Sequence, residues 1–236
     1  IPKSIESYYQ ETGRAGRDGG EGHCLAFYNY RDIEKLEKFM SGKPVAEQEI
    51  GMALLQEMVA YAETSISRRK FILHYFGEAF DEKTGEGGDM DDNVRFPKPK
   101  VEARDELIQL LEIIRDTHQK YKSKEIVNVL IGKTNSQIIS YKTHEKPFFG
   151  RGQAQSDKFW MALIRQAIVA GYISKKIENY GILFLSNEGE VFLEKPSSFL
   201  MSKDHDHEKN ILQSKSFRAN GAIDIELMRL LKSLRK

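Results

Sequence analysis

The stretch Tyr172-Ile173-Ser174-Lys175-Lys176-Ile177-Glu178-Asn179-Tyr180-Gly181-Ile182-Leu183-Phe184-Leu185 decides the fold, because it places two apolar segments on either side of a tight turn. Short runs of β-branched and aromatic residues predict strands at residues 172–174 and 182–185. Asn179-Tyr180-Gly181 supplies residues typical of a hairpin turn between them. The stretch is therefore predicted to be a β-hairpin, and its lysines make that hairpin basic.

Helices are predicted before this hairpin. Leucine and isoleucine recur at three- and four-residue steps within residues 102–116, which indicates one buried face. Further helices are predicted at residues 123–131, 136–140 and 156–170, with Trp160 on the apolar face of the last. Helices followed by a basic hairpin are typical of a winged helix, which places helix ends and its wing against duplex DNA.

The charge distribution favours a polyanionic partner for this region. Residues 120–180 contain eleven lysines and arginines against four acidic residues, whereas the whole chain has a formal net charge of +1. Helix and loop N-termini expose N–H groups that favour phosphate. The DNA-contact candidates lie there and on the hairpin: Lys133, Thr134, Asn135, Ser136, Arg151, Ser156, Lys175, Lys176 and Tyr180. Each loop candidate, taken singly, could equally be a solvated surface residue.

Near the start of the chain, the run Gln10-Glu11-Thr12-Gly13-Arg14-Ala15-Gly16-Arg17-Asp18-Gly19 sets two arginines three residues apart on a glycine-rich turn. A rigid pair of guanidinium groups suits stabilisation of a transferring phosphoryl group. The alternative is a solvated basic turn. The sequence has no G-x-x-x-x-G-K-[ST] loop and no acidic run for magnesium, so this chain is not expected to hydrolyse ATP alone.

This run, together with Pro2-Lys3-Ser4-Ile5-Glu6 and Tyr8-Tyr9 before it, resembles the last conserved motif of superfamily 2 helicases, and within them RecQ. The resemblance implies that Arg17 is an arginine finger, that Arg14 lies near the phosphates, and that Gln10 couples the ATP site to DNA. Residues 149–173 resemble the RecQ C-terminal module, and Tyr180 matches the aromatic wedge at its wing tip. Base stacking is worth roughly 1–3 kcal/mol, comparable to opening one base pair.

Taken together, the resemblance implies the C-terminal portion of an ATP-dependent 3′-to-5′ DNA helicase acting in repair and recombination. ATP and Mg²⁺ would be cofactors of the longer parent. Duplex or forked DNA, including single-strand/duplex junctions, would be the partner. The rival interpretations are a winged-helix regulator or architectural protein without a motor, and a winged helix that contacts protein.

A helical hairpin is predicted from residues 46–61 and 66–76. The run Ser67-Arg68-Arg69-Lys70-Phe71-Ile72-Leu73-His74-Tyr75-Phe76-Gly77-Glu78 resembles the RecQ zinc-domain helix, which opens with a cysteine. The four ligand positions of the family carry Ser67, Gly88, Asp91 and Val94, which cannot provide a tetrahedral nitrogen or sulfur set, so no zinc is expected. An EF-hand-like calcium loop at residues 89–100 is the other metal interpretation, but it lacks the glycine and glutamate of that motif.

The expected fold class is therefore multidomain and mainly α with small β elements: a helical hairpin followed by a winged helix and preceded by the end of a RecA-like α/β lobe. The expected boundaries are residues 1–43 for the lobe end, 44–98 for the metal-free hairpin and 99–196 for the RQC winged helix. Residues 197–221 are expected to be a linker, and residues 222–236 the start of a truncated HRDC-like module.

The chain has one cysteine, Cys24, which excludes an internal disulfide. It falls in an apolar run at residues 22–30 that is predicted to be a buried strand. Because the sequence has no secretory signal and no apolar run near eighteen residues, a cytoplasmic, nucleoid-associated protein is expected.

Overall fold

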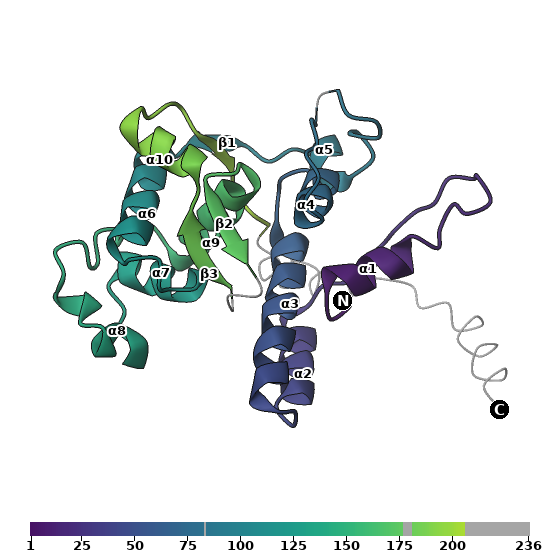
Figure 1. Ribbon diagram of the computed structural model, residues 1–236. Coiled ribbons are helices and arrows are strands. Elements are labelled where there is room, and N and C mark those ends of the chain that lie inside the picture. The colour runs from purple at the N-terminus through teal and green to yellow at the C-terminus, as the bar shows by residue number, and fades with distance from the viewer. Residues whose placement is uncertain (83, 177–180, 206–236) are drawn as a thin grey trace, which may run out of the picture. The chain divides into compact units, whose positions relative to one another are not determined.

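The computed structural model describes residues 1–82, 84–176 and 181–205, and these are mostly helical (Figure 1). In chain order the elements are α1 (Ile5–Thr12), α2 (Tyr30–Met40), α3 (Val45–Glu63), α4 (Arg68–Tyr75), α5 (Asp92–Arg95), β1 (Lys100–Glu102), α6 (Arg104–Asp116), α7 (Ser123–Ile131), α8 (Ser136–Ser140), the 3₁₀ turn η1 (Thr143–Glu145), α9 (Asp157–Val169), β2 (Ile173–Lys176), β3 (Ile182–Leu185), α10 (Asn187–Glu194) and β4 (Leu200–Ser202). Within this part of the chain, no helix has both the length and the apolar character needed to cross a membrane.

The largest hydrophobic core joins α6, α7 and α9 to the hairpin formed by β2 and β3. The predicted apolar face of α6 is confirmed, since Leu107, Leu110, Leu111 and Ile114 are all fully buried. Trp160 on α9 is also fully buried, and its Nε1–H donates to the Gly152 carbonyl at 2.9 Å. These helices and the hairpin make up the predicted winged helix.

The hairpin is antiparallel, as predicted, with Ile173 opposite Leu185 and Lys176 opposite Ile182. It is extended at one edge, where Leu183 N–H donates to the Tyr121 carbonyl at 3.0 Å. This contact ties β3 to the segment that leads into α7.

Two features of the winged helix were not predicted from the sequence. Strand β1 pairs antiparallel with β4, with Lys100 opposite Ser202. Helix α10 lies between the hairpin and β4, and Ser186 caps it by accepting the Gly189 N–H at 3.0 Å. Residues 197–202, expected to begin a linker, therefore contain a paired strand, while residues 222–236 lie outside the described residues.

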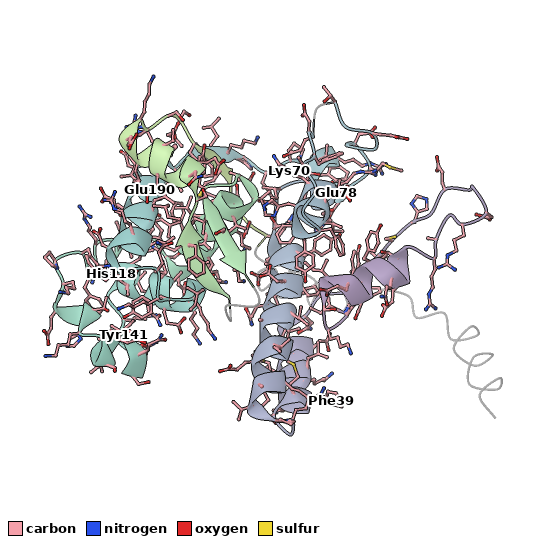
Figure 2. The ribbon with its side chains drawn as sticks, viewed as in Figure 1. Phe39, Lys70, Glu78, His118, Tyr141 and Glu190 are labelled. Atoms are coloured by element: carbon pink, nitrogen blue, oxygen red, sulfur yellow. The ribbon has the colours of Figure 1, made fainter. Side chains whose placement is uncertain are left out.

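Helices α1, α2 and α3 form the N-terminal part of the structure, with Ile5 and Ile33 buried against α3. Two expectations fail here. Residues 21–29 contain no strand, and Cys24 is exposed. A strand needs a neighbouring strand to satisfy its backbone groups, and none of the described residues provides one. Phe39 is 76% exposed at the end of α2 (Figure 2).

Candidate functional site

Two glycines bring the loops that carry most DNA-contact candidates together. Gly132 ends α7 in the left-handed conformation, with φ of 74°, and Gly150 has φ of 78°. Gly150 N–H donates to the Val129 carbonyl and Gly152 N–H to the Leu130 carbonyl, both at 2.8 Å. A Cβ atom on Gly132 would lie 3.3 Å from the Gly150 Cα, so the two chain segments touch backbone to backbone. Loop 133–136 therefore lies beside loop 150–156.

The first of these loops presents Lys133, Thr134 and Ser136 to solvent. Asn135 is different, because its Oδ1 accepts the Ile138 N–H at 2.8 Å and caps α8. A capped N–H is no longer available to phosphate, so Asn135 organises this loop. Lysine and hydroxyl groups remain for contacts with a DNA backbone.

The second loop contains Arg151 and Ser156. Ser156 caps α9 by accepting the Phe159 N–H at 3.2 Å. The Arg151 guanidinium donates to Glu112 of α6 at 2.9 Å, and its side chain is 49% exposed. Exposed ion pairs of this kind contribute little free energy, so this guanidinium could exchange its carboxylate for a phosphate at low cost.

Strand β2 of the wing is held by an ion pair that the sequence did not reveal. The Lys175 ammonium pairs with the Glu57 carboxylate of α3, and the two side chains are only 18% and 16% exposed. Lys175, predicted to contact DNA, is therefore engaged within the protein. Lys176 belongs to β2, and Tyr180 lies outside the described residues. No pattern along the sequence could have indicated a pair between residues 118 positions apart.

The arginine turn follows α1, which Ser4 caps by accepting the Ser7 N–H at 3.2 Å. Gly16 takes φ of 72°, where a Cβ atom would lie 2.9 Å from the Gly20 carbonyl oxygen. The three residues predicted to act at an ATP site, Gln10, Arg14 and Arg17, line one open hollow together with Tyr9 and Gly13. Both guanidinium groups lie on an exposed surface, which leaves them available to an anion.

The four residues that the resemblance places at zinc-ligand positions, Ser67, Gly88, Asp91 and Val94, do not form a metal site. Glycine and valine offer no side-chain donor, and the Ser67 hydroxyl donates its hydrogen to Asp91 Oδ2 at 3.0 Å. Both Asp91 oxygens already accept hydrogen bonds, Oδ2 also from the Arg68 N–H and Oδ1 from the Val94 N–H, each at 3.0 Å. Across the described ranges, no three His, Cys, Asp or Glu side chains gather in a way that could hold a metal ion. This donor set does not fit structural zinc.

His74, on α4 of the same hairpin, is also not placed as a ligand. Burial lowers the pKa of this histidine, and a hydrogen bond with the Ile168 backbone acts in the opposite direction. The contact joins α4 to α9, so the imidazole packs between the hairpin and the winged helix.

The fold defines a class, a winged-helix domain that follows a zinc-domain-like helical hairpin and an arginine turn. Comparison with known families agrees with that class. Residues 97–210 match the RQC domain, and residues 30–90 match the RecQ zinc-binding domain. The chain belongs to the RecQ family.

Relatives match over much of the chain. It is 31% identical over 207 residues to the ATP-dependent DNA helicase RecQ of Haemophilus influenzae, covering 86% of this chain and 33% of that protein. It is 31% identical over 190 residues to the RecQ-like DNA helicase blm-1 of Caenorhabditis elegans, covering 75% and 19%. It is 49% identical over 84 residues to the ATP-dependent DNA helicase hus2/rqh1 of Schizosaccharomyces pombe, covering 34% and 6%. The chain thus spans no more than a third of the length of these relatives.

Proposed function

We propose that this chain is the DNA-binding portion of a RecQ-like, ATP-dependent DNA helicase that moves 3′ to 5′ in DNA repair and recombination. The observation that carries the proposal is the junction of loops 133–136 and 150–156 at Gly132 and Gly150, which gathers lysine, arginine and hydroxyl groups on one surface. The relatives named above are DNA helicases, which supports a motor in the longer parent protein.

The proposed roles of the arginine turn, the two loops and the wing follow from the chemistry of their side chains. Arg14 and Arg17 would bind the phosphates of ATP, since paired guanidinium groups stabilise phosphoryl charge. The rest of the ATP and Mg²⁺ site would be provided by other parts of the parent protein. Lys133 and Arg151 would hold the DNA backbone, which fixes position without reading sequence. Tyr180 would stack on the terminal base pair and keep it open.

Fluorescence anisotropy with forked, blunt-duplex and single-stranded DNA across a salt series tests the proposal. The wild-type chain is expected to prefer the fork or duplex end, with affinity falling steeply as salt rises. Tyr180→Ala should reduce the fork preference, while Tyr180→Phe, which keeps an aromatic ring, should retain it. Binding that is equal for every duplex and indifferent to Tyr180 would instead indicate a duplex-binding regulator without a strand-separating wing.

A further inference from the structure

The region that holds zinc in this family is closed here by a set of side-chain hydrogen bonds. Asp91 lies at its centre, because its carboxylate joins the start of α4 to the start of α5. Oδ2 accepts from the Ser67 hydroxyl and the Arg68 N–H, and Oδ1 accepts from the Val94 N–H, all at 3.0 Å. Ser67 is 2% exposed. A half-buried carboxylate that accepts from several N–H and O–H donors makes strong, charge-assisted bonds.

Arg68 and Asp92 add a second connection between the same two segments. The guanidinium of Arg68 binds the Asp92 carboxylate through Nε and Nη2, with Nη2 to Oδ2 at 3.0 Å. Its third nitrogen, Nη1, donates to the Tyr61 carbonyl at 2.8 Å, and the group lies over the Tyr61 ring at 5.4 Å. One arginine thus links the end of α3 to α5.

Asn93 binds both the segment that precedes α4 and a residue that follows the last strand of the winged helix. This residue is only 4% exposed. Its amide Nδ2 donates to the carbonyls of Thr64 at 2.9 Å and Ile66 at 2.8 Å. Its Oδ1 is hydrogen-bonded to Nε2 of His205 at 2.7 Å, just beyond β4. The consecutive residues Asp91, Asp92 and Asn93 therefore each bind the segment between α3 and α4.

These contacts close the loop that a metal would otherwise close. The chain leaves α4 and returns at α5, and a bond between Ser67 and Asp91 spans 24 positions. Further side-chain contacts across the described part of this loop are the pair between Lys70 of α4 (Figure 2) and Glu82, at 2.8 Å with both groups about a third exposed, and Arg69 over the Phe80 ring at 5.6 Å. An exposed pair of that kind contributes little. The bonds of half-buried Asp91 and buried Asn93, with the Arg68–Asp92 pair, therefore supply most of the closure.

We propose that this chain has exchanged the metal cross-link of its zinc-binding domain for a polar lock, defined as Ser67, Arg68, Asp91, Asp92 and Asn93. The lock fixes the hairpin without a metal ion. It also disfavours a substitute cation, because three of the roughly four acceptor sites of the Asp91 carboxylate are filled by hydrogen-bond donors. Through Asn93 and His205, the lock also holds the chain that leaves the winged helix.

Metal analysis and a matched pair of variants test the proposal. Wild-type chain purified without chelator is expected to contain far less than one zinc per molecule, and excess EDTA should leave its melting temperature unchanged. Asp91→Ala should lower the melting temperature by roughly 5–10 °C, since three part-buried hydrogen bonds are lost together. Asp89→Ala is the control, because Asp89 is an exposed aspartate two positions away in the same loop whose side chain is outside the lock.

Amide hydrogen exchange gives a local measure. Exchange at Arg68 and Val94 should accelerate at least tenfold in Asp91→Ala and stay unchanged in Asp89→Ala. If Asp91→Ala does not fold, Asp91→Asn and Ser67→Ala remove fewer bonds, and a double-mutant cycle should show the two positions to be coupled. Near-stoichiometric zinc with a melting temperature that falls in EDTA would overturn the proposal. So would equal behaviour of the Asp91 and Asp89 variants.

Discussion

Replacing Arg165 by methionine should be the most damaging single change to the contact between α9 and the helical hairpin. The guanidinium binds Asp204 through Nε at 3.0 Å and through Nη2, and its Nη1 lies 3.4 Å from Glu63 Oε2 at the end of α3. The three side chains are 10%, 11% and 16% exposed. One buried cation therefore serves two buried carboxylates.

The magnitude follows from this imbalance. Removing one partner of a buried ion pair costs about 3–5 kcal/mol, because the opposite charge remains buried and uncompensated. Methionine preserves much of the apolar stem, so little of that cost is a cavity. We expect Arg165→Met to lose about 3–4 kcal/mol. Asp204→Asn should lose about 1 kcal/mol or less, because Arg165 and Glu63 still balance each other.

The stability loss caused by Arg165→Met should also depend on pH in a definite direction. Burial raises the pKa of the Asp204 carboxyl above its ordinary value, although Arg165 beside it acts to lower it. A carboxyl whose folded pKa is raised binds protons more readily in the folded state, so its contribution to stability falls as pH rises through that pKa. Without Arg165 the pKa should rise further. The stability deficit of Arg165→Met should therefore shrink between pH 7 and pH 5.

Urea unfolding monitored by the fluorescence of Trp160, the only tryptophan and a residue of the same helix, measures these differences. Arg115→Met is the matched control, since Arg115 pairs with Asp116 at 3.6 Å with its side chain 48% exposed, and should change stability by less than about 0.5 kcal/mol. A loss below about 1 kcal/mol for Arg165→Met, or a deficit that grows at pH 5, would refute the reasoning.

Three further changes have definite expected outcomes. Gly152→Ala should destabilise the winged helix by about 1–3 kcal/mol in urea unfolding, because its Cβ atom would lie 2.6 Å from Cζ2 of the buried Trp160 ring. Arg151→Ala should leave stability nearly unchanged but weaken DNA binding and lower the salt slope by about one, as measured by anisotropy. Lys175→Met should lower stability more than DNA affinity, because it leaves Glu57 buried without its partner; a large loss of affinity at unchanged stability would restore Lys175 to the DNA-binding surface.

The helices of the winged helix were predictable because each carries a local signal. The apolar spacing of α6 and the glycine that ends α7 are both local signals, which can be recognised within a few consecutive residues. Helix α10 was missed, although Ser186 offers a cap signal before it. Its Gly189 is explained only by the fold, since a Cβ atom there would lie 2.3 Å from the Tyr172 carbonyl oxygen.

Long-range pairings were not predictable. Strands β1 and β4 are three residues each and pair across nearly the whole domain, so neither carries enough pattern to be recognised alone. The candidate site shows the same limit. The sequence predicted loop residues such as Lys133 and Arg151 as DNA contacts. It did not predict that Arg151 pairs with Glu112 or Lys175 with Glu57, because such partners are set by packing.

Two buried ion pairs between the hairpin and the winged helix both involve acidic residues of α3. Lys175 joins β2 of the wing to the middle of α3, and Arg165 joins α9 to the end of α3. Buried pairs contribute little net stability compared with apolar replacements, but they strongly penalise any arrangement that separates them. Their effect is therefore to fix orientation. In its proposed role in strand separation, the wing must resist the force of the duplex against it, and anchoring β2 to a 19-residue helix meets that requirement. Loops 133–136 and 150–156, proposed above to contact the DNA backbone, carry the exposed pair of Arg151 with Glu112, so the Arg151 guanidinium can engage a phosphate while β2 stays fixed against α3.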